Sequence, residues 1–293
     1  MATKTSRIAA LAACLWVSSA FGQPTPAPTA PPRYKVLAVY TGKDDLAHVS
    51  FVKEARAWFA RMAAEHHFAF ESTTDWDRLS AESLAPYRVV VFLDTRPESP
   101  KQRAAFRKYM EDGGGWMGFH FAAFALTPSK YPQDWGWYHD DFLGSGSYVS
   151  NTWRPTSAVL RVEDSHHPAT ANLPATFKSS PNEWYRWSRD LRKNKDIKIL
   201  ASIDPSSFPL GTGPKKHEIW HEGDYPVAWT NQKYRMIYFN MGHNDLDHAT
   251  RPPKDLSSTF ASEPQSRMIL NALEWLGTSD KPATDTPAKA RRN

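Results

Sequence analysis

The chain contains 293 residues, of which 41% are hydrophobic, and this length suffices for one large or two small domains. Its 36 Lys and Arg outnumber its 31 Asp and Glu, but the two end segments account for most of this excess. Because the part between them is close to neutral, the composition argues against nucleic acid as a partner. The only cysteine, Cys14, lies in the first end segment, so we expect neither disulfide bonds nor thiol chemistry in the mature protein.

The two ends of the chain have the composition of a targeting segment and of unfolded polypeptide. Residues 1–22 resemble a signal peptide, because two basic residues precede an apolar run at 8–17 and small residues stand at the cleavage position. This run is too short to span a bilayer, so we predict a periplasmic or secreted protein without a membrane anchor. The expected order is a proline-rich linker at 23–32, an α/β domain at 33–277 and a disordered tail at 278–293.

Apolar strands alternate with helices in the first half of the chain. Ser99 followed by Pro100 is typical of a helix start. Three glycines at 113–115 end that helix, and Gly118 leaves room for a large neighbouring group. Short loops between strands and helices predict right-handed parallel crossovers, so we expect a doubly wound, mostly parallel α/β sheet flanked by helices, as in flavodoxin. The expected strands are 34–41, 68–72, 88–94 and 116–119, and the expected helices are 49–67 and 99–112, with a helical turn in 77–85.

The second half begins with an inserted region, residues 121–150, that is rich in aromatic residues and glycine. A long loop of this composition predicts an ordered pocket wall. We expect Trp135 and Trp137 to offer flat surfaces on which sugar rings stack. Further along, the expected elements are strands at 156–163, 183–187, 197–203, 225–230 and 234–241 and an amphipathic helix at 262–276.

Polar side chains follow several strands at the carboxyl edge of the predicted sheet, where open α/β sheets bind ligands. Glu183 and Tyr185 can join this group from the inserted half of the chain. Histidines with a carboxylate form either an acid–base set near neutral pH or a divalent metal site, and zinc or manganese is the ion expected in the second case. A third interpretation is that some of these histidines only cap loops. The residues at the edge are His48, Asp94, His120 and His243, and the candidate metal ligands are His48, His120 and His243.

Residues 217–221 spell His-Glu-Ile-Trp-His, the HExxH pattern of zinc metalloproteases. Glycines and prolines on both sides, from Gly211 to Pro226, leave barely two helical turns, so the sequence favours a loop there. The chain has neither a GxSxG motif nor a cysteine near His120, which disfavours acyl transfer by a serine or cysteine nucleophile.

Five short segments, taken in their order and spacing, carry a family resemblance. They are 113–120 (GGGWMGFH), 167–168 (HP), 183–185 (EWY), 226–229 (PVAW) and 238–243 (YFNMGH). These segments resemble the ThuA-like (trehalose utilisation) family over about residues 34–276. The resemblance implies the fold of class I glutamine amidotransferases, in which a nucleophilic cysteine follows a central strand and a histidine follows a later strand. Here His120 lies near the place of that cysteine and His243 in the place of that histidine, so the resemblance implies the pocket without the amidotransferase chemistry.

The same resemblance implies a small-molecule carbohydrate as partner. Family members are associated with disaccharide catabolism, often alongside oxidoreductases that make keto-sugars. One departure from the family concerns the region after residues 143–146. Family members commonly carry a histidine there, whereas this chain has Tyr148 and Asn151.

Three hypotheses follow, and they leave open whether the protein is an enzyme. The first is an exported sugar-metabolism protein that acts on a disaccharide or keto-sugar by proton transfer beside a carbonyl group. The second is a non-catalytic carbohydrate-binding protein, and the third is a secreted metalloprotease that uses His217 and His221. In the first hypothesis, the catalytic residues are His120, Glu183 and His243, and the substrate-binding residues are His48, Asp94, Trp135, Trp137 and Tyr185.

Overall fold

The computed structural model describes residues 30–43, 45–124, 135–152, 154–207 and 225–278. The chain divides into two units, Met1–Pro31 and Pro32–Asn293, and all that follows concerns the second unit. The predicted signal peptide, the tail from residue 279 onward and the HExxH segment lie outside the described residues. Within the described residues, no helix combines the length and apolar character that crossing a membrane requires.

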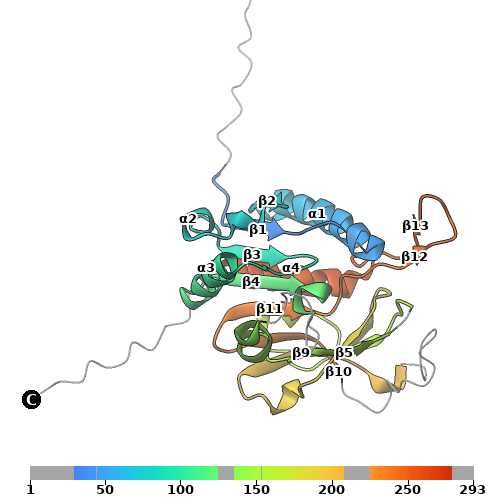
Figure 1. Ribbon diagram of the computed structural model, residues 1–293. Coiled ribbons are helices and arrows are strands. Elements are labelled where there is room, and N and C mark those ends of the chain that lie inside the picture. The colour runs from blue at the N-terminus through green and yellow to red at the C-terminus, as the bar shows by residue number, and fades with distance from the viewer. Residues whose placement is uncertain (1–29, 44, 125–134, 153, 208–224, 279–293) are drawn as a thin grey trace, which may run out of the picture. The chain divides into compact units, whose positions relative to one another are not determined.

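A nine-stranded sheet forms the centre of this unit, with strand order β2-β1-β3-β4-β11-β10-β9-β6-β7 (Figure 1). Its first five strands are parallel: β2 (Ala69–Thr73), β1 (Lys35–Val39), β3 (Val89–Phe92), β4 (Gly115–Phe119) and β11 (Arg235–Phe239). The remaining pairs are antiparallel and add β10 (Tyr225–Asn231), β9 (Ile197–Ile203), β6 (Val159–Val162) and β7 (Thr176–Lys178). The predicted α/β sheet is confirmed, and it is a mixed sheet.

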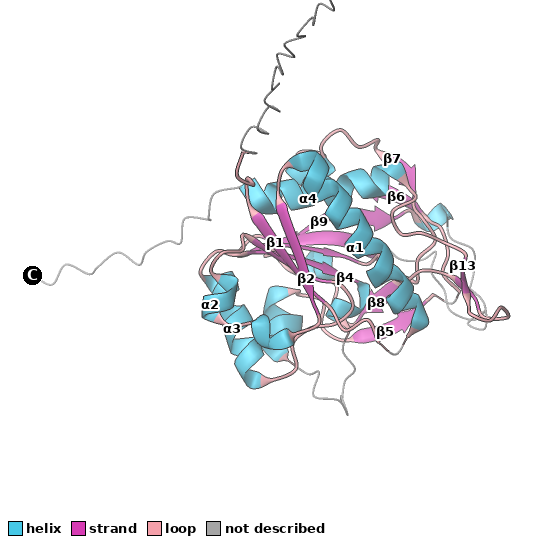
Figure 2. Cartoon of the chain, turned by 90° about the horizontal axis from the view of Figure 1, so that it is seen from above, coloured by secondary structure: helices cyan, strands magenta, loops and turns pink. Residues whose placement is uncertain are grey.

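Helices cover both faces of the sheet, so that successive residues of one strand contribute to two different cores. Val89 and Val91 belong to a core that includes residues of α1 (Leu46–His66) and α4 (Glu263–Thr278). Val90 and Phe92 belong to the other core, with residues of α2 (Ala81–Leu84) and α3 (Pro100–Glu111). Figure 2 shows α1 and α4 lying along the strands. Such burial on both faces explains why the parallel strands are apolar without alternation.

Short elements complete the unit. Two small antiparallel pairs join β5 (Tyr148–Asn151) with β8 (Tyr185–Trp187), and β12 (Leu246–Asp247) with β13 (Lys254–Asp255). The inserted region contains a turn of π-helix, η3 (Trp137–Phe142). The 3₁₀ turns are η1 (Trp76–Arg78), η2 (His120–Ala123), η4 (Pro168–Thr170), η5 (Leu191–Lys193) and η6 (Pro205–Ser207).

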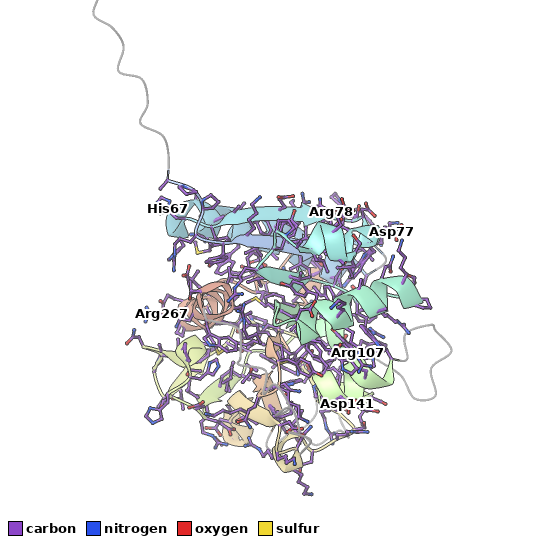
Figure 3. The ribbon with its side chains drawn as sticks, turned by 90° about the vertical axis from the view of Figure 1, so that its left-hand side faces the viewer. His67, Asp77, Arg78, Arg107, Asp141 and Arg267 are labelled. Carbon is purple, nitrogen blue, oxygen red and sulfur yellow. The ribbon has the colours of Figure 1, made fainter. Side chains whose placement is uncertain are left out.

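Local side-chain chemistry sets the helix ends. Ser99 and Gln102 form a capping box at the start of α3, with Pro100 in its first turn, as the sequence predicts. Helix α1 begins three residues before the predicted start, because the Asp45 carboxylate accepts a hydrogen bond from the Ala47 amide and caps it. It ends at His66, and the next residue, His67 (labelled in Figure 3), caps it with a left-handed φ of 56°.

Gly118 lies under the indole of Trp116, which is the large neighbour that the sequence predicts there. A β-carbon at position 118 would lie 2.1 Å from two ring carbons of Trp116. That ring is fully buried between Phe92 and Phe142, so it has little room to move.

We therefore expect Gly118→Ala to lower the free energy of unfolding by about 1–3 kcal/mol, through overpacking of the core. Urea denaturation monitored by tryptophan fluorescence measures this change. Gly136→Ala is the matched control, because a β-carbon there would meet only Asp140 Oδ2 at 4.0 Å. Equal stability of the two variants would contradict the expectation.

Candidate functional site

The carboxyl ends of the parallel strands bring four predicted residues to one edge of the sheet. His48 lies in the first turn of α1, which follows β1, and Asp94 follows β3. His120 follows β4 and His243 follows β11. The predicted placement at one edge is confirmed, since β1, β3, β4 and β11 run in the same direction.

Three of these residues form a buried histidine cluster, which consists of His48, His120 and His243. The ring centroid of His48 lies 5.3 Å from that of His120 and 5.0 Å from that of His243. The ring centroids of His120 and His243 are 5.3 Å apart. Glu183 joins the cluster, with Oε2 3.3 Å from His120 Nε2 and 3.7 Å from His243 Nε2. The exposed fractions of the four residues are 7% for His48, 0% for His120, 5% for Glu183 and 3% for His243.

The backbone at His120 and Gly242 allows the two strand ends to approach this closely. His120 has a φ of 38°, a left-handed conformation that a side chain other than glycine adopts rarely. Its carbonyl accepts a hydrogen bond from the Tyr238 hydroxyl at 2.8 Å. Gly242 has a φ of 133°, and a β-carbon there would lie 3.1 Å from His120 Cβ. Such strain persists only where surrounding contacts hold it, and it is concentrated at functional sites.

Asp45 is a further member of the cluster that the sequence analysis did not identify. Its Oδ2 lies 3.9 Å from His243 Nε2, and its side chain is 52% exposed. Its position just before a helix and after strand β1 is the sequence signal that could have revealed it, because aspartate at such a position is a helix cap. Asp45 is the one exposed member of the group, so the cluster meets solvent on this side.

Asp45, His48 and His243 together fit the requirements of a divalent metal ion. Each offers one ligand atom, and these three atoms lie within 4.8 Å of one another. His48 Nε2 and His243 Nδ1 are buried and have no hydrogen-bond partner among the residues that the structure describes. Two imidazoles and one carboxylate are a ligand set that suits zinc, manganese or iron. This set of three residues differs from the predicted candidate ligands, because it includes Asp45 and not His120.

Burial and charge give the three histidines different protonation behaviour. Burial lowers the pKa of both His48 and His120, so both imidazoles are neutral near pH 7. Burial also opposes protonation of His243, but the carboxylates of Asp45 and Glu183 outweigh it and raise the pKa of His243. The interaction with His243 holds the pKa of Asp45 well below its usual range. The cluster thus combines neutral imidazoles that can accept protons with one, His243, whose protonated form is favoured by two carboxylates.

Tyr185 lies against the cluster, as expected. Its ring centroid is 3.8 Å from that of His120. The Asn240 side chain fixes it by accepting from the Tyr185 amide at 3.0 Å and donating to its carbonyl at 2.9 Å. Burial raises the pKa of Tyr185 well above its usual value, so its hydroxyl stays protonated and remains a hydrogen-bond donor.

Trp135 and Trp137 lie elsewhere in the structure. Both rings pack against Phe106 of α3, at 6.1 and 6.3 Å. The guanidinium of Arg107 lies over the ring of Trp137 at 5.3 Å, and Figure 3 shows Arg107 beside η3. Among the described residues, neither indole makes a ring contact with the histidine cluster. The described part of the inserted region packs its two tryptophans on α3, and Trp137 also lines a surface cavity with Arg107 and Arg189, so the wall does not face the histidine cluster.

Other aromatic rings surround the cluster. Phe121 lies 5.0 Å from His48 and stacks on Phe124 at 4.6 Å. Phe124 in turn lies 4.8 Å from Tyr148 and 5.8 Å from Tyr185. Phe121, Phe124 and Tyr148 are half-buried, so this aromatic wall, rather than the two tryptophans, offers flat surfaces near the histidines.

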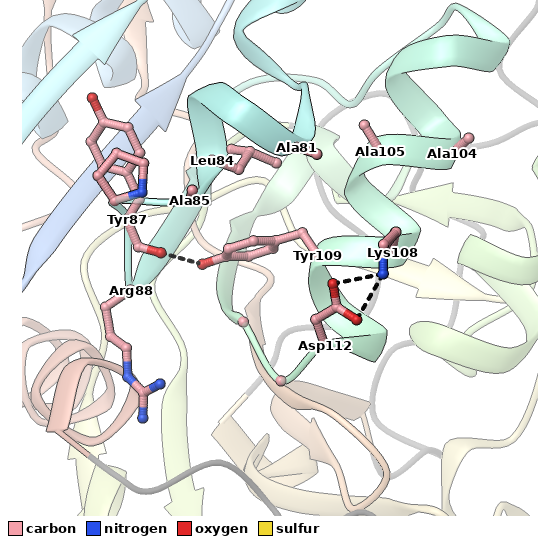
Figure 4. A pocket seen from close by; sticks show the side chains of 13 residues that line it. Ala81, Leu84, Ala85, Tyr87, Arg88, Ala104, Ala105, Lys108, Tyr109 and Asp112 are labelled. Atoms are coloured by element: carbon pink, nitrogen blue, oxygen red, sulfur yellow. Dashed lines mark hydrogen bonds and ion pairs between the residues drawn. The ribbon is translucent and has the colours of Figure 1, made fainter.

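A separate cavity of about 590 Å³ lies between α2 and α3 (Figure 4). Its lining includes Tyr87, Lys108, Tyr109 and Asp112, and none of the predicted site residues. Residues that precede β3 and β4, such as Arg88, also line it. It therefore lies at the amino ends of the strands, away from the histidine cluster.

The fold and the cluster define the class of protein. The mixed sheet, covered by helices on both faces, is of the glutamine amidotransferase-like class. The chain belongs to the trehalose utilisation (ThuA) family, which matches residues 35–276.

Solved structures agree with this assignment. A ThuA-like protein from Bacteroides uniformis is 36% identical over 89% of this chain and 97% of that chain, with a TM-score of 0.74. A ThuA-like protein from Parabacteroides merdae is 20% identical over 86% and 92% of the two chains, with a TM-score of 0.59, which shows the fold alone. None of the functionally curated proteins compared with the chain matches it.

Asp94 is buried at the edge of the sheet and holds the loop that leads to Asp45. Its carboxylate accepts hydrogen bonds from the Thr41 amide at 2.8 Å, the Thr41 hydroxyl at 2.8 Å and the Gly42 amide at 2.6 Å. Burial nevertheless raises the pKa of Asp94. The structure thus gives this carboxylate a role in the loop, while its predicted contact with substrate stays a prediction.

We expect Asp94→Ala to lower the free energy of unfolding by about 1–3 kcal/mol, because it leaves the part-buried amides of Thr41 and Gly42 without this acceptor. Urea denaturation measures the change. Asp77→Ala, which removes an exposed carboxylate that accepts from Gln102 Nε2, serves as control and is expected to stay close to wild type. A loss no greater than that of the control would show that the three hydrogen bonds do not stabilise the loop.

Proposed function

We propose that this protein is an exported enzyme of sugar metabolism that transfers protons beside the carbonyl group of a keto-sugar. The observation that carries the proposal is the histidine cluster with Glu183, a buried set of acid–base groups at the edge of the sheet where such sheets bind ligands, which meets solvent at Asp45. Membership of the ThuA family supports sugar metabolism. The composition of residues 1–22 supports export to the periplasm or the medium.

The different protonation states assign the roles. Neutral His120, oriented by its contact with Glu183, accepts a proton from the carbon next to the carbonyl group. Protonated His243 donates a proton to the carbonyl oxygen, which gives an enediol. Return of the first proton to the former carbonyl carbon, together with loss of the proton of the neighbouring hydroxyl group to His243, moves the carbonyl group by one position. When the carbon on the other side of the deprotonated carbon carries a glycosidic oxygen, the enolate instead re-forms the carbonyl group and makes a double bond to that carbon. The bond from that carbon to the glycosidic oxygen breaks as His243 protonates the leaving oxygen, so the sugar is cleaved by elimination.

Asp45, His48 and His243 are the residues that would hold a divalent ion, zinc or manganese. A bound ion supplies positive charge that polarises the carbonyl group. When His243 serves as a ligand, Tyr185 remains as a protonated donor beside His120. The aromatic wall of Phe121, Phe124 and Tyr148 would contact the apolar face of the sugar ring.

We expect His120→Ala, His243→Ala and Glu183→Gln each to lower kcat/KM for a 3-keto-disaccharide by at least about 100-fold, because each removes a proton donor or acceptor or its partner. Chromatography of the reaction products over time measures turnover. The exposed His248 provides the matched control, and His248→Ala is expected to match wild type. Full turnover by the His120 and His243 variants would refute the assignment. Saturable sugar binding by calorimetry without product would leave a carbohydrate-binding protein in place of the enzyme.

Elemental mass spectrometry of the untagged protein tests the ion. We expect about one equivalent of zinc or manganese in wild type and in His120→Ala, and a loss of at least about tenfold in Asp45→Ala, His48→Ala and His243→Ala. His248→Ala again serves as control. Retention of the ion by all three ligand variants would show that the metal binds elsewhere. Absence of metal from the wild-type protein would leave acid–base catalysis by the histidines without an ion.

A further inference from the structure

A chain of two hydrogen bonds leads from strand β5 to the carboxylate of Glu183. The Tyr148 hydroxyl donates to Asn151 Oδ1 at 2.7 Å, and Asn151 Nδ2 donates to Glu183 Oε1. The other carboxylate oxygen, Oε2, faces both His120 and His243.

Resting on the proposed function, we propose that Asn151 is a positioning residue for Glu183 and that Tyr148 fixes the orientation of the Asn151 amide. An asparagine side chain can present either its oxygen or its NH₂ group to a neighbour, and the two orientations have the same shape. Because the Tyr148 hydroxyl donates to the oxygen, the NH₂ group is the one that faces Glu183. Glu183 is thereby held at one oxygen, and its second oxygen stays directed at the histidines.

Strand pairing does not account for these two contacts. The pairing of β5 with β8 uses the backbone, with Asn151 opposite Tyr185 and Tyr148 opposite Trp187. The side-chain hydrogen bonds add nothing to that register, yet they end on a carboxylate that is 5% exposed. A buried carboxylate needs hydrogen-bond donors, and an amide supplies one without adding charge to the cluster.

Tyr148 also belongs to the aromatic wall, through its contacts with Phe124 at 4.8 Å and Tyr185 at 5.2 Å. The ring and the hydroxyl of this residue therefore have separate roles. The ring forms part of the surface beside the histidines, and the hydroxyl acts on Glu183 through Asn151. Removal of the hydroxyl alone separates the two.

The test compares Tyr148→Phe, Asn151→Ala and the double variant. We expect Asn151→Ala to lower kcat by about 10–100-fold with KM within about threefold of wild type, because a misdirected catalytic group costs rate rather than binding. Tyr148→Phe, which retains the ring, is expected to lower kcat by about 3–10-fold. Since Tyr148 acts through Asn151, the double variant is expected to equal Asn151→Ala.

Tyr87→Phe is the matched control, because it too removes a tyrosine hydroxyl that donates to a glutamate, here Glu71 at 2.7 Å and away from the site. It is expected to keep wild-type kinetics. Additive effects in the double variant, or a change confined to KM, would overturn the inference.

A crystal structure of Asn151→Ala gives a readout that does not depend on turnover. We expect Glu183 Oε2 to leave its position between His120 and His243, and an unmoved carboxylate would overturn the inference. A wild-type protein that turns over no keto-sugar, with Glu183 displaced in the variant, would refute the proposed function and leave the positioning role of Asn151 supported. If Asn151→Ala does not fold, a crystal structure of Tyr148→Phe takes its place, because that change removes only one oxygen atom.

Discussion

The close approach of the end of β4 to the end of β11 is the constraint on which the site depends. Hydrogen bonds of the parallel ladder fix the two strands side by side, so the residues that follow them must turn within a narrow space. Left-handed backbone at His120 and the missing side chain of Gly242 provide that turn. Without them, His120 and His243 would not lie close enough to share the carboxylate of Glu183.

Both carboxylates of the cluster divide their oxygens in the same manner. Glu183 uses Oε1 for Asn151 and directs Oε2 at two histidines. Asp45 uses Oδ1 for the Ala47 amide and directs Oδ2 at His243. In each carboxylate, one oxygen accepts a hydrogen bond that fixes the side chain, and the other faces the histidines. The acidic groups are therefore held in place and still available for chemistry.

Much of the edge of the sheet could be predicted from the sequence. Apolar strands such as Ile197–Ile203 have the expected bounds, and the histidines after β4 and β11 follow from the polarity of parallel strands. The direction of β10 could not be inferred as readily, although its short connection to β11 is typical of an antiparallel pair.

Contacts between elements that are distant in sequence could not be predicted from the sequence pattern. The pattern of Trp135 and Trp137 shows that they are flat and apolar, but not that Phe106 of α3 provides the surface they cover. Asp45 was missed for a different reason, since a start of α1 at residue 49 leaves it in a loop. The cap moves the helix start by three residues and brings this carboxylate to the histidines.

The Asp45 carboxylate both caps α1 and faces His243, and this has a consequence for the entropy of ligand binding. A carboxylate on a free loop loses rotational freedom when it binds a ligand, and this loss weakens binding. The Asp45 side chain has already lost that freedom, because the start of α1 holds it through the Ala47 amide. The side-chain entropy of Asp45, the exposed residue beside the cluster, is therefore lost when the helix folds and not when a ligand binds.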